Sequence, residues 1–195
     1  GMLGRFQAEN ALLALMTVDF LKIQSSSGHL SENELRSIFA DFHSIRLPGR
    51  LELMGEKPPI LLDGAHTPAS VRLALEAYDE LYSEPPVCIF GSVYGKNAEK
   101  MAELLSPRCR AIIISRPGTF KPSRPEEVHA IFSAHRADTQ LMIDAAEAFE
   151  RAVSISQGRT PILVIGSFYM VSEIRPHALT HCREEKRRVE SSVEP

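Results

Sequence analysis

The chain has 195 residues, of which 44% are hydrophobic and 24% are charged, and its formal net charge is −3 at pH 7. This length is enough for one well-packed domain with extensions, and the composition is that of an ordinary globular protein rather than a disordered or fibrous one. The small net charge gives no electrostatic reason to expect a nucleic acid or an anionic membrane as a partner, and no apolar run approaches the ~20 residues that a membrane span requires.

The N-terminal part of the chain is predicted to be helical. Between residues 6 and 23 the apolar residues recur at helical spacing, which predicts an amphipathic helix. A Ser-rich loop follows, and Ser31 and Glu34 then have the spacing of a capping box, so a second helix is expected to extend to about residue 42. The boundary to the rest of the chain is expected within residues 46–50.

After this boundary, short apolar runs alternate with helical patterns. Strands are predicted at residues 51–54, 60–62, 87–90, 111–115, 139–143 and 162–165, and helices at residues 67–82, 97–105, 124–135 and 144–156. Ser123 and Glu126 have the spacing of a capping box for the third of these helices. The alternation predicts an α/β fold with a Rossmann-like, mainly parallel sheet and helices on both faces. Right-handed crossovers bring the loops after the strands to one edge, where such sheets bind ligands.

The clearest motif is the hexapeptide Asp-Gly-Ala-His-Thr-Pro at residues 63–68, which follows an apolar strand. Two small residues allow a tight turn, and Thr67 and Pro68 suit the N-cap and the first position of a helix. Asp63 and His66 are therefore predicted at the ligand-binding edge, beside a helix N-terminus that favours an anion such as a carboxylate. The alternative is a plain strand–turn–helix connection in which the histidine has no function.

A second loop, residues 90–97, also connects a strand to a helix. It is not a phosphate-binding loop of the G-x-x-x-x-G-K-[S/T] type, because only three residues separate Gly91 from Gly95 and because Asn97 cannot supply a hydroxyl for magnesium. Lys96 could still bind a phosphate as a point charge. Alternatively, it is a solvated lysine at the start of a helix.

Arg50 and Ser167 are further candidates. Arg50 follows the hinge-like pair Pro48-Gly49, and arginine can bind a phosphate or a carboxylate through two parallel hydrogen bonds; a surface arginine is the alternative. Ser167 follows a strand and Gly166, where its hydroxyl offers a donor and an acceptor or simply caps the next helix. The surrounding residues do not form a G-x-S-x-G nucleophile elbow.

The cysteines and histidines point to no metal site. Cys88, Cys109 and Cys182 lack C-x-x-C spacing, and the histidines other than His66 lack ligand spacing such as H-E-x-x-H. The N-terminus has no charged-then-apolar signal pattern. We therefore expect a cytoplasmic protein without disulfides.

Taken in this order, the motifs resemble the C-terminal domain of the folylpolyglutamate synthase/dihydrofolate synthase family, within the Mur ligase superfamily. The resemblance covers about residues 3–175, and the Asp-Gly-Ala-His segment is its most specific part. Upstream, Gly4, Gln7, Asn10 and Ala11 resemble the family's Gly-x-His-Gln-x-x-Asn-Ala helix, which closes the central ATPase domain. The matching segments are residues 47–52, 60–66, 91–96 and 165–171.

Members of that family join glutamate to a folate through an acyl phosphate made from ATP, which the glutamate amine then attacks. The resemblance implies that Asp63 and His66 are catalytic and that, with Ser167, they bind the incoming glutamate. It implies that Arg50 and Lys96 contact the ATP phosphates. Such a transfer requires positioning and positive charge, and a neighbouring His or Asp suits an amine that must be held close and unprotonated.

The resemblance also implies cofactors and partners. ATP and Mg²⁺ would be bound mainly by a central domain that precedes residue 1, so the chain alone is expected to be inactive. The implied partners are glutamate, a folate or dihydropteroate, and the upstream ATPase domain of the same polypeptide, with no nucleic acid and no membrane. By this resemblance, residues 1–45 are a helical segment that closes the ATPase domain, residues 46–176 are the glutamate ligase domain, and residues 177–195 are a charged tail, expected to be an exposed or frayed helix.

The sequence departs from the family pattern at three places. Thr67 stands where the family usually has Asn, Phe6 replaces a His, and Gly95-Lys96-Asn97 replaces Asp-Lys-Asp. These departures bear on the choice of substrate rather than on the fold.

Two other functions are compatible with the same fold. One is a binding module that has lost catalysis, which the departures support. The other is a different Mur-type amide ligase, although residues 166–169 favour the folate branch. The coding sequence upstream of Met2 discriminates, because a Gly-rich Gly-Lys-[Ser/Thr] loop there favours the ligase.

Overall fold

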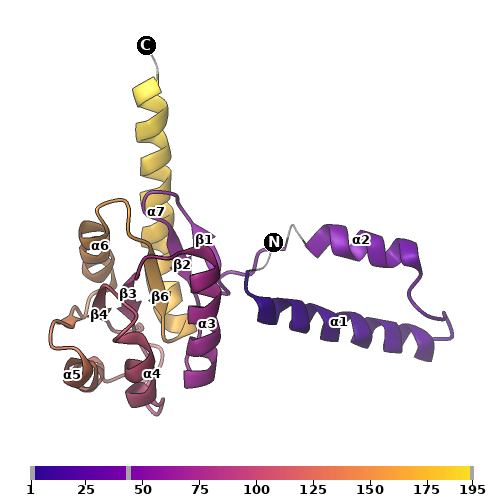
Figure 1. The fold of residues 1–195 in the computed structure, drawn as a ribbon, viewed down its shortest axis with the longest axis horizontal. Coiled ribbons are helices and arrows are strands. Elements are labelled where there is room, and N and C mark those ends of the chain that lie inside the picture. The colour runs from indigo at the N-terminus through magenta and orange to yellow at the C-terminus, as the bar shows by residue number, and fades with distance from the viewer. Residues whose placement is uncertain (1–2, 43–44, 194–195) are drawn as a thin grey trace. The chain divides into compact units, whose positions relative to one another are not determined.

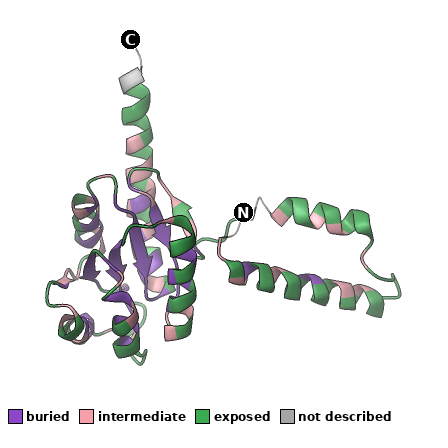
Figure 2. Cartoon of the chain, in the orientation of Figure 1, coloured by how far each residue is buried: buried purple, intermediate pink, exposed green. Residues whose placement is uncertain are grey.

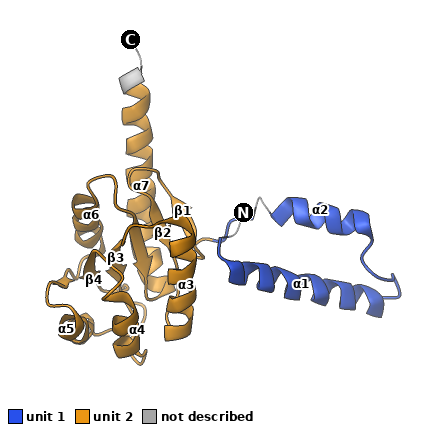
Figure 3. Cartoon of the chain, in the orientation of Figure 1, with its two compact units in different colours: residues 1–47 blue, residues 48–195 orange. Residues whose placement is uncertain are grey.

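A computed structural model of the chain describes residues 3–42 and 45–193. The chain forms two compact units, Gly1–Leu47 and Pro48–Pro195 (Figure 3). The first unit is helical, and the second contains the sheet (Figure 1). In the part of the chain that is described, no helix is long and apolar enough to cross a membrane.

The first unit consists of α1 (Arg5–Gln24) and α2 (Glu32–Phe42). The capping box predicted at the start of α2 is confirmed, because the Ser31 N–H donates to the Glu34 carboxylate at 2.8 Å and the Glu34 N–H donates to the Ser31 hydroxyl at 3.4 Å. Lys22 of α1 forms an ion pair with Glu34 at 2.6 Å. The hydrogen bonds from Lys22 and Ser31 lower the pKa of Glu34 to about 2.

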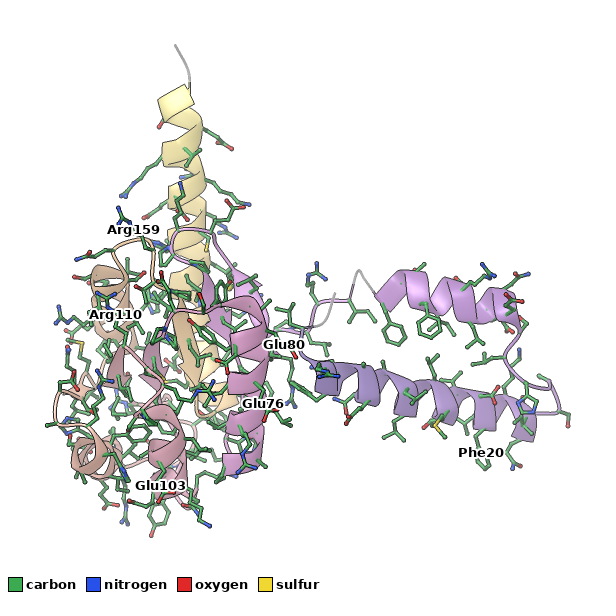
Figure 4. All side chains as sticks on the ribbon, viewed as in Figure 1. Phe20, Glu76, Glu80, Glu103, Arg110 and Arg159 are labelled. Carbon is green, nitrogen blue, oxygen red and sulfur yellow. The ribbon has the colours of Figure 1, made fainter. Side chains whose placement is uncertain are left out.

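The helix predicted near residues 6–23 is present, but the expectation that it is amphipathic is wrong. Leu12 and Leu21 are 59% and 60% exposed, although their spacing of nine residues places them on opposite sides of the helix. Phe20 projects outward from α1 in Figure 4. The apolar residues therefore do not form one stripe that α2 could cover. Apolar residues on all sides of a helix are typical of a helix that is surrounded by protein.

The second unit is built on a six-stranded sheet, as the sequence predicts. Along the sheet the strands are β1 (Glu52–Met54), β2 (Ile60–Leu62), β6 (Ile162–Ile165), β3 (Val87–Phe90), β4 (Ala111–Ile114) and β5 (Gln140–Leu141). Only β1 is antiparallel to its neighbour, and all other pairs are parallel. The strands β2, β3, β4 and β6 are buried along their whole length, as parallel strands with both faces covered must be (Figure 2).

Helices cover both faces of this sheet, which confirms the predicted fold class. On one face α4 (Ala98–Leu105) packs against α3 (Pro68–Leu81) and α5 (Pro125–His135), whereas on the other α6 (Ala145–Ser156) packs against α7 (Phe168–Val193). Alternate strand residues such as Ile89 and Val164 pack with α6 and α7. Phe90 points to the opposite face, where its ring lies 4.7 Å from that of Phe132 in α5.

One local feature differs from what the sequence pattern predicts. The prediction of a capping box at Ser123 and Glu126 is wrong. The helix α5 begins at Pro125, and its N-cap, Arg124, forms no side-chain capping hydrogen bond. Proline restricts the residue before it to an extended conformation and itself suits the first helical position. At the other end of the unit the tail is helical, as expected: residues 177–193 continue α7 without a break, and the helix projects beyond the sheet (Figure 1).

Candidate functional site

Most of the predicted site residues lie in loops that follow neighbouring strands. β2, β6 and β3 are adjacent and parallel, so the loops after them meet at one edge of the sheet. Hydrogen bonds join these loops directly. The Gly166 N–H donates to the Ala65 carbonyl at 2.9 Å, and the Ser167 hydroxyl donates to the Gly91 carbonyl at 2.9 Å.

Asp63 is buried at this edge, with 5% of its surface exposed. Both of its carboxylate oxygens accept backbone hydrogen bonds, from the Leu51 N–H at 2.9 Å and from the Ala65 N–H at 2.8 Å. Burial raises the pKa of Asp63, while the two N–H donors and the charge of Arg50 lower it in part. Asp63 thus connects the turn before β1 to the loop after β2 and does not present a free carboxylate.

Arg50 lies on the turn that Asp63 holds. The flanking residues Gly49 and Leu51 have positive φ angles of 68° and 46°, and a left-handed conformation is costly for leucine, whose side chain has a Cβ. Leu51 is buried, and its N–H donates to the Asp63 carboxylate. This hydrogen bond stabilises the strained turn. Arg50 itself is exposed, and its guanidinium carbon lies 4.5 Å from the centre of the Phe168 ring, which is a cation–π distance.

His66 is half-buried, and its Nδ1 lies 3.0 Å from the Gly64 carbonyl oxygen. A carbonyl can only accept, so Nδ1 carries a proton in this contact and Nε2 of the neutral ring remains an acceptor. The predicted cap of the next helix is confirmed, because Thr67 accepts the Ser70 N–H and proline occupies the first turn. His66 is therefore held in one orientation at the edge of the sheet.

Ser167 is 3% exposed, and its hydroxyl is already used in two hydrogen bonds. It donates to the Gly91 carbonyl at 2.9 Å and accepts the Met170 N–H at 3.0 Å. The hydroxyl thus caps α7 and ties the loop after β6 to the loop after β3. Its contact with a ligand stays a prediction.

Lys96 lies in a pocket formed by the loop after β3 and the start of α5. Arg124 and Tyr94 line the same pocket, and neither was singled out by the sequence analysis. Arg124 directly precedes Pro125, the first residue of α5, and the loop that leads into this helix lies at the ligand-binding edge of the sheet. Arg50 is not among the residues that line this pocket and lies over the Phe168 ring instead.

A further ion pair supports the turn that carries Arg50. The Gly49 N–H donates to the Glu52 carboxylate at 2.9 Å, and the Arg175 guanidinium of α7 binds the same carboxylate at 2.8 Å. Burial of Glu52 tends to raise its pKa, but Arg175 and the Gly49 N–H outweigh burial and lower the pKa from its usual value of 4.5.

The Arg175→Gln substitution is expected to lower the free energy of unfolding by about 1 kcal/mol near neutral pH. Because the pKa of Glu52 is lower in the folded state, the ion pair contributes stability above the unfolded value of 4.5, and this contribution is lost as the pH falls through the folded pKa. Urea denaturation at several pH values should show that the difference in the free energy of unfolding between Arg175→Gln and the wild type decreases toward acid pH. Arg183→Gln, which removes an exposed charge from the same helix, is the control. A difference that does not change with pH would contradict the assignment.

Comparisons with known proteins show similarity to amide-forming ligases. The family model described as "Mur ligase, glutamate ligase domain" matches residues 49–168. The dihydrofolate synthase/folylpolyglutamate synthase of Bacillus subtilis is 26% identical over 176 residues, which are 89% of this chain and 39% of the relative. A UDP-N-acetylmuramoyl-L-alanyl-D-glutamate–2,6-diaminopimelate ligase of Coxiella burnetii is 27% identical over 173 residues, which are 85% of this chain and 33% of the relative.

The fold is also that of solved structures. The folylpolyglutamate synthase of Mycobacterium tuberculosis, solved with ADP and AMPPCP, superposes with a TM-score of 0.77 at 23% identity, over 90% of this chain and 40% of that one. The chain thus spans about two fifths of the length of its synthase relatives.

Proposed function

The chain belongs to the Mur ligase family through its glutamate ligase domain, and we propose that it is the glutamate-binding part of an ATP-dependent amide ligase of the folylpolyglutamate synthase/dihydrofolate synthase type. The observation that carries the proposal is the buried Asp63 carboxylate. It holds together the turn that presents Arg50 and the loop that presents His66. These two side chains offer a positive charge and a proton acceptor at one edge of the sheet.

The proposed reaction joins an amine to an activated carboxylate. The glutamate nitrogen attacks the carbonyl carbon of an acyl phosphate, the bond to the phosphate oxygen breaks, and the nitrogen loses a proton. Nε2 of His66 is proposed to accept a hydrogen bond from the amine and to keep it unprotonated. Arg50 is proposed to stabilise charge on the phosphate. Asp63 then acts by positioning both groups, and Ser167 by fixing the loop beside them.

ATP supplies the phosphoryl group that activates the carboxylate, and in this proposal a domain upstream of residue 1 binds most of it. Among residues 3–42 and 45–193, no group of three or more His, Cys, Asp or Glu side chains could hold a metal ion. In this proposal, the upstream domain also holds the Mg²⁺ that accompanies ATP. The apolar surface that α1 exposes on several sides supports a cover from the same domain, because such a surface is stable in water only when it is packed. We also propose that the protein acts in the cytoplasm.

The proposal predicts that this chain binds glutamate but has no ligase activity alone. In ¹⁵N-labelled protein, glutamate is expected to shift the amide signals of the Asp63–His66 loop, and His66→Gln should weaken that response. The matched control is His135→Gln, which changes an exposed histidine at the end of α5. Unchanged spectra at millimolar glutamate would count against a preformed site, and glutamate-dependent ADP release by the chain alone would refute the assignment of ATP to another domain.

A different Mur-type amide ligase is the second candidate, because diaminopimelate ligases are similar to this chain at about the same identity. The two candidates differ in the amino acid bound. The same titration with diaminopimelate decides between them, since the folate-type ligase should respond to glutamate alone. A chain that has lost catalysis would bind an amino acid yet remain inactive when joined to its upstream domain.

A further inference from the structure

The pocket that contains Lys96 has a lining suited to an anion. It has a volume of about 200 Å³ and lies where the loop after β3 meets the start of α5. Its polar side chains are those of Ser92, Tyr94, Lys96, Arg124 and Glu127. We call it the α4–α5 pocket, because the first turns of these two helices form part of its wall.

The walls of the α4–α5 pocket are fixed to one another. The Tyr94 N–H donates to the Pro122 carbonyl at 2.8 Å, which joins the loop after β3 to the loop after β4. The guanidinium carbon of Arg124 lies 4.1 Å from the centre of the Tyr94 ring, and its Nη1 binds Glu127 at 2.9 Å. The pocket therefore exists before any ligand arrives.

Two polar groups in the pocket have no partner of their own. The side chain of Ser92 belongs to a residue that is only 4% exposed, and its hydroxyl has no hydrogen-bond partner among the described residues. Lys96 likewise forms no ion pair with any residue in the described part of the chain. Because Arg124 neutralises Glu127, Lys96 leaves the pocket with a net positive charge. The N-terminal ends of α4 and α5 add partial positive charge, so an acceptor-rich anion is the ligand that satisfies this lining.

The position of the pocket bears on the length of that ligand. α3, α4 and α5 pack side by side, and packed helices lie 8–10 Å apart. The start of α3, where His66 lies, is thus on the order of 12–15 Å from the gap between α4 and α5. One α-linked residue spans at most ~3.6 Å, and the two additional carbons between the amine and the side-chain carboxylate of glutamate still leave a single amino acid bound at His66 too short to reach Lys96. A chain of several linked residues does.

We propose that the α4–α5 pocket binds a carboxylate of an oligo-γ-glutamyl chain, the polyanionic tail that a polyglutamate-forming ligase extends. This inference rests on the proposed function, which supplies the chemistry of the tail. Lys96 pairs with the carboxylate, the Ser92 hydroxyl donates to it, and Arg124 lines the opposite wall. A substrate that already carries several glutamates is then held at two places, the edge of the sheet and this pocket.

The test is a titration of the whole ¹⁵N-labelled chain with γ-linked triglutamate. The amide signals of residues 92–96 and 124 are expected to shift and saturate, and rising salt should weaken the effect. Lys96→Gln should weaken binding about tenfold, as expected for the loss of one charge-assisted hydrogen bond. Lys100→Gln is the matched control, because it removes a lysine from α4 that does not line the pocket. The control should bind as the wild type does.

Other outcomes overturn the inference in distinguishable ways. If glutamate alone, or inorganic phosphate, shifts the pocket signals as strongly as triglutamate, the pocket binds a simple anion and not a chain. If triglutamate shifts the His66 loop but not the pocket, the inference fails and the proposed function stands. If triglutamate shifts the pocket while no amino acid shifts the His66 loop, the proposed function fails and the carboxylate site stands.

Discussion

Replacing Asp63 with alanine is expected to lower the free energy of unfolding of the Pro48–Pro195 unit by about 3 kcal/mol, because the N–H groups of Leu51 and Ala65 lose their acceptor in a buried place. Each unpaired donor costs about 1–3 kcal/mol, and release of the buried charge offsets part of the sum. The chain has no tryptophan, so urea denaturation is best followed by circular dichroism.

The consequence for function is a loss of order at Arg50. Leu51 is left with a positive φ of 46° and no hydrogen bond to hold it, so Arg50 is expected to leave the face of Phe168. Asp63→Asn keeps one oxygen acceptor, so its free energy of unfolding should lie between those of Asp63→Ala and the wild type. Asp79→Ala is the control, because it breaks an exposed ion pair with Arg108, which is worth about 0–1 kcal/mol. Equal losses for Asp63→Ala and Asp79→Ala would contradict the role given to Asp63.

The Gly166→Ala substitution is expected to lower the free energy of unfolding by about 3–4 kcal/mol, because backbone strain and a steric clash both destabilise the folded state. The φ angle of Gly166 is +115°, which residues with a Cβ rarely adopt. An added Cβ would also lie 2.7 Å from the Gly91 carbonyl oxygen and 2.9 Å from the Phe90 ring. The buried backbone directly after β3 cannot move away, so the hydrogen bond between Ser167 and Gly91 is expected to break.

Gly158→Ala separates the two effects, because Gly158 has a φ of +69° but open space around the site of a Cβ. It should cost about 1 kcal/mol, the strain of the left-handed conformation alone. Thermal unfolding compares the two variants. Gly166→Ala is expected to unfold at a clearly lower temperature, and a midpoint no lower than that of Gly158→Ala would show that the loops after β3 and β6 are not packed as described.

The secondary structure of the second unit could be predicted because its signals are local. The apolar runs of β2, β3 and β6 and the cap at Thr67 act within a few residues, and the structure has them where the sequence places them. The error at Ser123 has a local cause too. Two local signals compete there, and the proline at residue 125 fixes the start of the helix more firmly than a capping box does.

The amino-acid sequence by itself determined the α/β fold, the family resemblance and the edge of the sheet at which Asp63, His66 and Ser167 lie. Only the tertiary structure decided which distant groups Asp63 and Ser167 contact there. The Asp63 carboxylate accepts a hydrogen bond from the N–H of Leu51, twelve positions away, and the Ser167 hydroxyl donates one to the carbonyl of Gly91, 76 positions away. The first pairing depends on β1 folding back against β2, and the second on the order of the strands, which places β6 next to β3. That order comes from packing the whole sheet, and no local pattern encodes it.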